Sequence, residues 1–341
     1  MTTETQSKVR CFNAAHAVAG ALDGERIAII GYGHLGRPIA LNLRDSGCRS
    51  IIIGNIADDY VAQAKTDGFD VVSIEQATKG ADIVMIMLPD EVIPEVYVEA
   101  IAPHLSPRSA IVFGSGYTLG YDLIKPSKDL DVLLLAPRMA GENARQRFQA
   151  GSGFYAYVSV ENEASGKAWK RLLGLADWIG VLRAGAVELS ARKEADLDLL
   201  VEQTLGATLG MAILSTFDIG VDAGIPPEAM VLEMYMSEEM ETVWRAFRTE
   251  GFMRASNAHG PTAMYGGFIR TMALLGTDLP GKLRTTFNEI KSGAFATQFQ
   301  AERKAGYPML KAAQAMAMGE HPITEAEDSL RARLASSPTD S

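Results

Sequence analysis

The sequence predicts an α/β protein in two parts, a doubly wound parallel sheet followed by an all-helical domain. Short, continuously apolar runs alternate with helical segments up to about residue 185, as in parallel sheets covered on both faces. From about residue 187 the chain is rich in Ala, Leu, Met, Glu and Gln, with apolar residues at helical spacing. We therefore expect domains over residues 1–186 and 187–330, and a flexible tail over 331–341.

The elements of the first domain follow in order from these apolar runs. After a polar lead-in over 1–24, the first strand is expected at 26–30 and the first helix at 38–44. Further strands are expected at 50–53, 71–72, 83–88, 110–113 and 132–136, with helices at 59–67 and 92–101. In the second domain the long helical segments are 188–217, 227–250 and 283–305.

Composition limits the classes of partner. With 341 residues, 47% of them hydrophobic and 22% charged, the chain is long and apolar enough to fold around a core, which excludes widespread disorder. The net charge of −10 argues against a nucleic acid or an anionic membrane and favours a small-molecule substrate. Two cysteines, no cleavable leader and no long apolar stretch predict a cytoplasmic protein without disulfides or a membrane span.

A glycine-rich turn marks a dinucleotide site. The residues 31–36 read GYGHLG, directly after the first strand and directly before the first helix. The first glycine permits a tight turn, the second lets the backbone approach a pyrophosphate, and the third lets the helix pack on the strand. Without that context the motif indicates only a tight turn. Here we expect the cofactor to be bound by Gly31, Tyr32, Gly33, His34, Leu35 and Gly36.

The loop after the second strand predicts which cofactor binds. It reads GNIADD over 54–59 and contains no Lys or Arg to neutralise a 2′-phosphate, whereas Asp58 can accept hydrogen bonds from a free ribose hydroxyl. We therefore expect NADH to be preferred over NADPH, with Asn55 and Asp58 at the ribose. The alternative role for Asp58 is an ordinary helix N-cap. Pro89, after the strand at 83–88, completes the expected cofactor site.

Several longer segments carry a family resemblance. They are GYGHLGRPIALNLRDSG (31–47), MIMLPDE (85–91), KEADLDLLVEQ (193–203), AGIPPEA (223–229) and EIKSGAFA (289–296). In these the chain resembles the short form of the ketol-acid reductoisomerases along almost its whole length. The resemblance implies a Rossmann domain and a knotted helical domain that pairs between two subunits. It also implies a homodimer, or an assembly of dimers, with active sites shared between subunits.

Metal binding is implied only in part. The family binds its substrate through two magnesium ions, and Asp198 and Glu202 match its first carboxylate pair, where a spacing of four places both on one helix face. A solvated acidic face is the alternative. Glu233 matches the second pair, but Ser237 replaces the fourth carboxylate. Glu238 or Glu239 would substitute only if the helix shifted by a residue or more. The expectation is therefore one Mg²⁺ or none.

Other departures from the family fall on the same pocket. Ser115 stands where the family has a histidine, and Arg138 replaces a lysine and is expected to pair with a substrate carboxylate or phosphonate. The substrate serine has no clear counterpart around 256–266, where His259 and Thr262 are candidate replacements. The proton donor stays open among Glu202, Tyr117 and His259.

The combined pattern predicts a reductase that has lost a rearrangement step. Hydride transfer needs only an oriented C=O or C=N and a group that stabilises the product, whereas alkyl migration needs a doubly polarised substrate. We expect an NADH-dependent reductase of a small oxo acid or imine, with Asp198, Glu202 and Arg138 as catalytic residues. The alternatives are a genuine magnesium-dependent ketol-acid reductoisomerase of branched-chain amino-acid synthesis and a non-catalytic NADH-binding protein. We also expect Met230, Leu232, Met236 and Met240 to be buried, either within the core of one chain or against a second subunit.

Overall fold

The computed structural model describes residues 9–255, 260–317 and 321–335. Its contacts divide the chain into two compact units, Met1–Leu197 and Asp198–Ser341, which are described in turn. The predicted domain boundary after residue 186 lies earlier than this division. The difference arises because strand β9 (Gly185–Glu188) belongs to the sheet and Ala191, the first residue of helix α9 (Ala191–Leu200), still packs into the core of the first unit.

The first unit is built on one sheet, which has nine strands within the described residues, in the order β1-β9-β8-β7-β6-β5-β2-β3-β4. Six of them, from β4 to β7 in that order, are parallel to one another, as the sequence predicted. Their bounds are β2 (Ile27–Ile30), β3 (Ile51–Gly54), β4 (Val71–Val72), β5 (Ile83–Ile86), β6 (Ala110–Phe113) and β7 (Asp131–Pro137). Within this parallel group β2 is an inner strand, with β3 and β4 on one side and β5, β6 and β7 on the other, as in dinucleotide-binding folds.

Three strands were not predicted. β8 (Tyr155–Asn162) pairs antiparallel with β7, β9 pairs parallel with β8, and β1 (Cys11–Phe12) closes that edge antiparallel to β9. The lead-in over 1–24 is therefore not simply polar, because Phe12 and Leu22 are buried in the core. The expected helical segment from residue 188 also begins later, since Glu188 is the last residue of β9 and α9 starts at Ala191.

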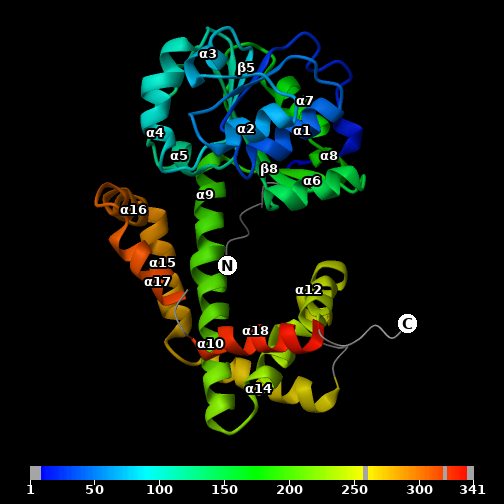
Figure 1. The fold of residues 1–341 in the computed structure, drawn as a ribbon, viewed down its shortest axis with the longest axis vertical. Coiled ribbons are helices and arrows are strands. Elements are labelled where there is room, and N and C mark those ends of the chain that lie inside the picture. Colours follow the sequence, from blue (N-terminus) through cyan, green and yellow to red (C-terminus); the bar gives the residue numbers. More distant parts are fainter. Residues whose placement is uncertain (1–8, 256–259, 318–320, 336–341) are drawn as a thin grey trace, which may run out of the picture. The chain divides into compact units, whose positions relative to one another are not determined.

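Helices cover both faces of this sheet (Figure 1). One apolar core includes Ile39 of α1 (Gly36–Asp45) and Leu172 of α7 (Ala168–Trp178), and the other includes Ile74 of α3 (Ile74–Thr78) and Tyr97 of the π-helix η2 (Tyr97–Ile101). The remaining helices are η1 (Ala14–His16), α2 (Asp59–Thr66), α4 (Ile93–Val96), η3 (Ala102–His104), α5 (Tyr117–Gly120), α6 (Gly141–Gln149) and α8 (Val181–Ala184). The predicted helix at 92–101 is thus α4 continued by a π-helix.

The described part of the second unit contains only helices. After α9 come η4 (Val201–Gly206, a π-helix), α10 (Ala207–Asp222), α11 (Pro227–Val231), η5 (Leu232–Met236, a π-helix), α12 (Glu239–Glu250), α13 (Phe252–Ala255), α14 (Pro261–Leu275), α15 (Leu279–Ser292), α16 (Ala294–Lys304), α17 (Pro308–Ala317) and α18 (Pro322–Ala335). Two predicted helices are interrupted, one where Glu238 has φ +63° and one where Gly293 has φ +81°. α18 continues into the segment expected to be a flexible tail.

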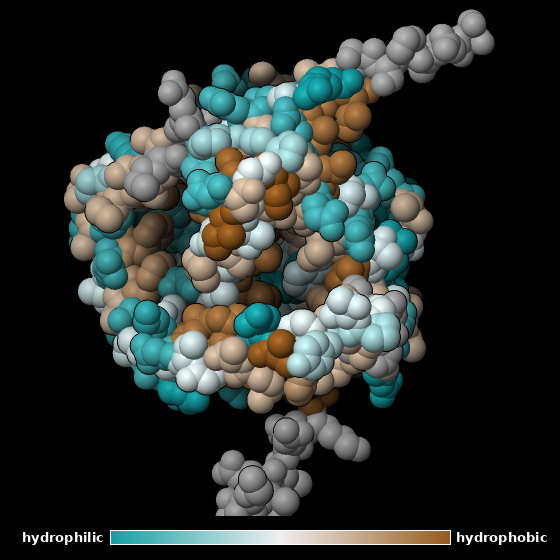
Figure 2. All heavy atoms as spheres, turned by 90° about the horizontal axis from the view of Figure 1, so that it is seen from below, coloured by the Kyte–Doolittle hydropathy of each residue, from teal (hydrophilic) through white to brown (hydrophobic). Residues whose placement is uncertain are grey.

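The second unit buries little of its apolar surface within one chain. Its core cluster consists of Phe217, Met230, Val231 and Ala326, with Met236 packed against it. Leu232 and Met240 are exposed. Figure 2 shows apolar side chains at the surface among polar ones. Within the described residues one helix, Ala191–Asp222, is long and apolar enough to cross a membrane, which is weak evidence because core helices of water-soluble proteins share these properties.

Candidate cofactor and active site

The glycine turn between β2 and α1 has the geometry of a pyrophosphate cradle. Gly31 has φ +93°, which an L side chain rarely adopts, and a Cβ on Gly36 would lie 2.0 Å from the carbonyl oxygen of Gly31. A Cβ on Gly33 would instead meet only the ring of Tyr60, at 4.0 Å. Protein packing therefore explains the first and third glycines, whereas the second leaves open space beside the first turn of α1, where a phosphate binds well.

A cavity of about 610 Å³ lies along this turn and runs past the carboxyl ends of β2, β3, β5 and β6. The structure brings the predicted cofactor residues together on its wall, except Gly36, which packs beneath the turn. The residues on the wall are Gly31, Tyr32, Gly33, His34, Leu35, Asn55, Asp58 and Pro89.

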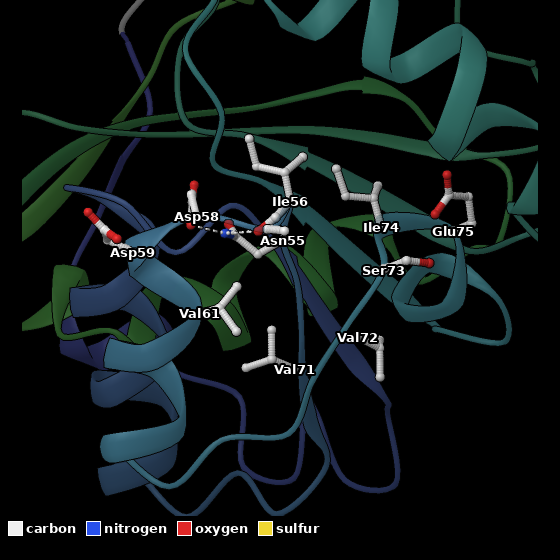
Figure 3. A pocket seen from close by; sticks show the side chains of 11 residues that line it. Asn55, Ile56, Asp58, Asp59, Val61, Val71, Val72, Ser73, Ile74 and Glu75 are labelled. Atoms are coloured by element: carbon white, nitrogen blue, oxygen red, sulfur yellow. Dashed lines mark hydrogen bonds between the residues drawn. The ribbon is translucent and has the colours of Figure 1, made fainter.

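A second cavity, of about 820 Å³, extends the first past Asn55 and Asp58 (Figure 3). Asn55 donates a hydrogen bond from Nδ2 to Oδ1 of Asp58 at 2.7 Å, and the same oxygen accepts from the backbone N–H of Tyr60 at 3.0 Å. Asp58 is therefore the N-cap of α2, the alternative that the sequence left open. The charged side chains among the described residues that line this cavity are all carboxylates: Asp58, Asp59 and Glu75.

At the other end of the cofactor cavity, polar groups follow β5 and β6. The hydroxyl of Ser115 donates to Oδ2 of Asp90 at 3.0 Å and accepts from the N–H of Tyr117 at 3.2 Å. The phenol oxygen of Tyr117 is buried and has no hydrogen-bond partner among the described residues. Burial first, and then the charges of Asp90 and Glu91, raise the pKa of Tyr117 to about 12. This phenol therefore stays protonated at neutral pH and can donate a hydrogen bond.

Arg138, at the end of β7, is held by a residue that sequence reasoning missed. Its Nη2 donates to Oε1 of Glu194 at 2.6 Å, and Oε2 of Glu194 accepts from the N–H of Gly116 at 2.7 Å. The guanidinium also lies over the ring of Tyr157, 5.2 Å from its centre. A Cβ on Gly116 would lie 2.6 Å from Oε2 of Glu194, so this contact requires glycine. One signal pointed to Glu194, namely its place four residues before Asp198 in the family-like segment 193–203.

The candidate metal ligands are less well assembled. Asp198 lies on α9, Glu202 on η4 and Glu233 on η5, and within the described residues no group of three or more His, Cys, Asp and Glu side chains is arranged to hold a metal ion. Because Glu233 is expected from a partner subunit, three-carboxylate binding stays a prediction.

The π-helix η5 changes the residue spacing next to Glu233. The N–H of Ser237 donates to the carbonyl of Leu232 at 3.1 Å, five residues back, so this turn holds one residue more than an α-helical turn. Glu238 follows Glu233 at this same spacing of five, at the point where φ is +63° and the helix is interrupted. Of the other candidates, Thr262 is exposed on α14, and His259 lies outside the described residues.

The position of the cofactor cavity defines the class of protein. In open parallel sheets, nucleotide cofactors bind outside the carboxyl ends of the strands at the point where the strand order reverses. Between β2 and β5 this chain has that reversal, and the cavity lies there. By fold and site the protein is a dinucleotide-dependent oxidoreductase.

Comparison with known proteins gives the family. Residues 21–185 match the model of the NADPH-binding domain of acetohydroxy acid isomeroreductase, and residues 192–336 match the C-terminal domain of ketol-acid reductoisomerase. The chain therefore belongs to the ketol-acid reductoisomerase family, as the sequence predicted.

Individual relatives agree with this assignment. The chain is 35% identical to the ketol-acid reductoisomerase (NADP(+)) of Pyrobaculum neutrophilum, over 92% of this chain and 95% of the relative. An NADH-preferring ketol-acid reductoisomerase from an uncultured archean has a similar structure, with a TM-score of 0.88, 29% identity and coverage of 94% and 98%. A semialdehyde dehydrogenase NAD-binding protein from Cupriavidus necator, 19% identical with a TM-score of 0.61 and coverage of 79% and 99%, shares the fold alone.

Proposed function

We propose that this protein is an NADH-dependent reductase that reduces a small oxo acid or imine without alkyl migration. The observation that carries the proposal is the contrast between the cofactor turn and the residues that follow β6 and β7. The cofactor turn keeps every feature that a pyrophosphate needs, whereas the groups expected at the reacting end differ from the family pattern. Ser115 is hydrogen-bonded to Asp90 in the place of the family's histidine, and an arginine held by Glu194 replaces the lysine.

The preference for NADH is supported by the charge around the ribose end. A 2′-phosphate there would face Asp58, Asp59 and Glu75, and no Lys or Arg is found among the described residues that line that cavity. Relatives of both cofactor types exist, since one is named for NADP(+) and another is described as NADH-preferring. The family alone therefore does not decide the cofactor, and the local charges support NADH.

The chain's residues have distinct roles in the proposed reaction. Gly33 and the first turn of α1 would bind the pyrophosphate, Asn55 and Asp58 the adenosine ribose, and Pro89 and Ser115 the nicotinamide end. When bound, NADH supplies the hydride that reduces the C=O or C=N group. Arg138, oriented by Glu194, would bind the carboxylate of the substrate through its planar fork of donors. The raised pKa of Tyr117 suits its phenol to hydrogen bonding and not to proton transfer, so the proton donor stays open among Glu202, Tyr117 and His259.

Asp198 and Glu202, with Glu233 from a partner subunit, would hold at most one Mg²⁺. Their carboxylate oxygens are hard ligands of the kind this ion prefers, and such an ion would polarise an oxygen of the substrate. The site would lack the fourth carboxylate of the family, which is the physical reason to expect reduction without rearrangement.

Assembly follows from the apolar surface of the second unit. Leu232 and Met240, and Leu214 and Ile219 on α10, are exposed in the single chain. Such side chains are normally covered by protein. We propose that a second copy of this chain covers them, in a homodimer or an assembly of dimers with active sites shared between subunits.

One screen tests the catalytic proposal. NADH oxidation is followed with a panel of 2-oxo acids, cyclic imines and 2-acetolactate, each with and without Mg²⁺. We expect turnover with an oxo acid or imine and no 2,3-dihydroxy-3-methylbutanoate from acetolactate. Formation of that product as fast as the best simple reduction would contradict the proposal. Tight NADH binding with no oxidation across the panel would instead identify a non-catalytic binding protein.

A genuine magnesium-dependent isomeroreductase is the second candidate, and the π-helix η5 is the observation that favours it. The extra residue in that turn would let Glu238 serve as the fourth carboxylate. In that case Glu238→Gln should lower both the Mg²⁺ dependence and the conversion of acetolactate, whereas Glu239→Gln, a neighbouring control, should change neither. Equal behaviour of the two variants would remove Glu238 from the metal site.

A further inference from the structure

We propose that Asp67 helps to set the cofactor preference by holding the guanidinium of Arg37 away from the ribose position where NADPH carries its extra phosphate, an assignment that rests on the proposed use of NADH. Asp67 lies just beyond α2, outside the loop 54–59 from which the sequence predicted that preference. The residue thus acts on specificity through Arg37 and not through its own contact with the cofactor.

Arg37 lies beside the predicted cofactor site. A third cavity, of about 340 Å³, adjoins the glycine turn and is lined by Arg37 together with Gly33, Asp59, Tyr60 and Gln63. Gly33 and Tyr60 also line the main cofactor cavity, and Asp59 also lines the cavity at the ribose end. Among the described residues that line these three cavities, Arg37 is the one Lys or Arg side chain. It is therefore the nearest candidate to neutralise a 2′-phosphate.

Asp67 binds this cation through both carboxylate oxygens. Arg37 donates from Nε to Oδ2 at 2.7 Å and from Nη2 to Oδ1 at 3.2 Å. Oδ2 also accepts from the hydroxyl of Tyr32 at 2.9 Å and from Nε2 of Gln63 at 3.3 Å. The Asp67 side chain is 14% exposed, against 36% for that of Arg37. The more buried carboxylate therefore fixes the position of the arginine. A two-point pair of this kind is stronger and more directional than an ordinary surface ion pair.

The position of Asp67 draws the cation away from the ribose. Asp58 and Asp59, which face the ribose end, begin α2, whereas Asp67 is its C-cap. The eight residues of α2 separate these two ends by about 12 Å at 1.5 Å per residue. Gln63 lies between them on the wall shared with Arg37. Once released, the long arginine side chain can turn along this wall toward the first turn of α2.

Cofactor binding to the full-length protein tests this role without any turnover. Dissociation constants for NADH and NADPH are measured by nicotinamide fluorescence, and those for 2′-AMP and 5′-AMP by calorimetry. For Asp67→Ala we expect NADPH and 2′-AMP to bind about tenfold more tightly, in line with one charge-assisted contact. The constants for NADH and 5′-AMP should change less than about twofold. In the double variant Asp67→Ala/Arg37→Gln the gain should disappear.

A matched control separates this effect from the loss of any ion pair. Glu188→Gln releases Arg10 from a comparable pair on β9, away from the three cavities, and should leave the NADPH to NADH ratio unchanged. Asp67→Asn keeps the side-chain shape and should give a smaller shift in the direction of Asp67→Ala, which guards against misfolding of the alanine variant. Arg37→Gln alone should leave the ratio unchanged, because wild-type Arg37 is held away from the phosphate.

The outcomes distinguish the two proposals. A wild-type protein that binds NADPH more tightly than NADH would contradict the proposed cofactor. A wild-type protein that prefers NADH, with an unchanged ratio in Asp67→Ala or a gain that survives in the double variant, would overturn only the role of Asp67. Weaker NADPH binding in Arg37→Gln alone would overturn that role too, since it would mean that Arg37 already contacts the phosphate.

Discussion

Arg138 and Glu194 form an ion pair of 2.6 Å between the end of β7 and the first turns of α9, and the Glu194 side chain is only 1% exposed. Glu194 has a second attachment, because it also accepts the N–H of Gly116 after β6. The carboxylate of Glu194 thereby holds Arg138 beside Gly116, at the carboxyl ends of β7 and β6. An arginine held in this way can present its donors to a substrate carboxylate without losing side-chain entropy on binding.

Replacement of Glu194 should therefore weaken substrate binding more than cofactor binding. In Glu194→Gln, Arg138 loses its charged partner, and we expect KM for the oxo acid or imine to rise by about tenfold, with kcat reduced less. The dissociation constant of NADH should stay unchanged. Asp196→Asn is the control, since this carboxylate on the same helix pairs with Arg192 instead. An unchanged KM in Glu194→Gln would remove Glu194 from substrate positioning.

The two outer glycines of the turn should differ from the middle one. In Gly36→Ala the new Cβ would lie 2.0 Å from the carbonyl of Gly31, so we expect a fall in melting temperature as well as loss of NADH binding. In Gly33→Ala the Cβ has room in the protein and would intrude only on a ligand. This variant should melt like wild type but bind NADH at least about tenfold more weakly. Equal NADH affinity in Gly33→Ala would contradict the proposed pyrophosphate position.

The central parallel strands β2, β5 and β6 were predictable from sequence because they are buried on both faces. β2 and β5 are apolar at every position, and such a run can be recognised from the local sequence alone. β1 was not predictable in the same way. It has only two residues, Cys11 and Phe12, and it forms because β9, far along the chain, offers a free edge. The interruptions at Glu238 and Gly293 were missed because the flanking segments keep helical composition across them.

The site was predictable where one local motif contains it. The glycine turn, Asn55 and Pro89 follow strand ends, and apart from Gly36 all of these residues line the cofactor cavity. Glu194 and Asp67 were missed because their roles depend on partners far away in sequence or across a helix, Arg138 and Arg37. The N-cap role of Asp58 was weighed from the sequence, but the choice required the hydrogen bond to the N–H of Tyr60.

The exposed apolar side chains of α10 should be covered in a dimer. We expect a mass of at least two chains by light scattering at micromolar concentration. Leu214→Glu, which places a charge where 45% of the leucine is exposed in the single chain, should shift that mass toward the monomer. Val98→Glu is a control on η2 of the first unit, where the valine is 65% exposed, and should leave the mass unchanged. A monomeric wild-type protein would contradict the proposed assembly.

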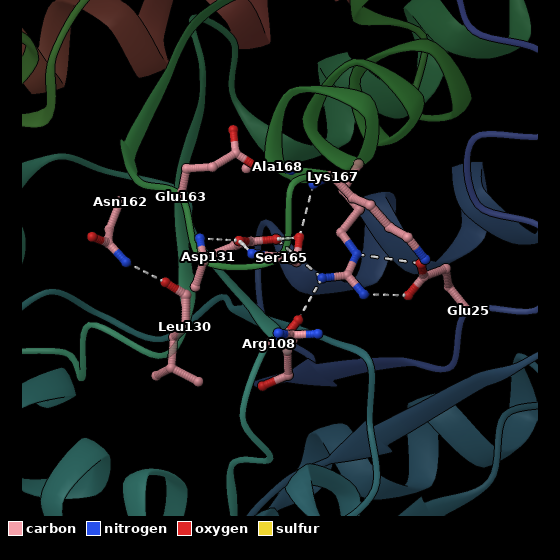
Figure 4. Close-up of polar contacts among 12 residues, drawn as sticks. Glu25, Arg108, Leu130, Asp131, Asn162, Glu163, Ser165, Lys167 and Ala168 are labelled. Carbon is pink, nitrogen blue, oxygen red and sulfur yellow. Dashed lines mark hydrogen bonds and ion pairs between the residues drawn. The ribbon is translucent and has the colours of Figure 1, made fainter.

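A buried ion cluster joins three segments at the opposite end of the strands (Figure 4). Arg171 on α7 donates to Asp131, the first residue of β7, at 3.1 Å, and to Glu25, which precedes β2, at 3.0 Å. Asp131 is fully buried and also accepts the N–H groups of Ala164 and Ser165, at 2.8 and 2.9 Å. Burial alone would raise the pKa of Asp131, but the hydrogen bonds from Ser165, Ala164 and Arg171 outweigh it and hold this pKa below its ordinary value of 3.8.

This lowered pKa makes the contribution of Asp131 to stability dependent on pH. A carboxyl group whose pKa is lower in the folded than in the unfolded chain stabilises the fold above its unfolded pKa, and this stabilisation is lost as the pH falls below about 3.8 toward the folded value. We expect Asp131→Asn to lower the unfolding free energy at pH 7 by about 1.5 to 3 kcal/mol, because Arg171 keeps its pair with Glu25 but loses a buried charge-assisted contact. The difference between wild type and variant, measured by urea unfolding, should shrink as the pH is lowered through 3.8.

Asp45→Asn is the matched control. The pKa of Asp45 is also lowered, but its side chain is 35% exposed and solvent screens its pair with Arg145, so its effect should stay near zero to 1 kcal/mol. If the difference for Asp131→Asn were the same at pH 3 and pH 7, its ionisation would not be the source of the stability.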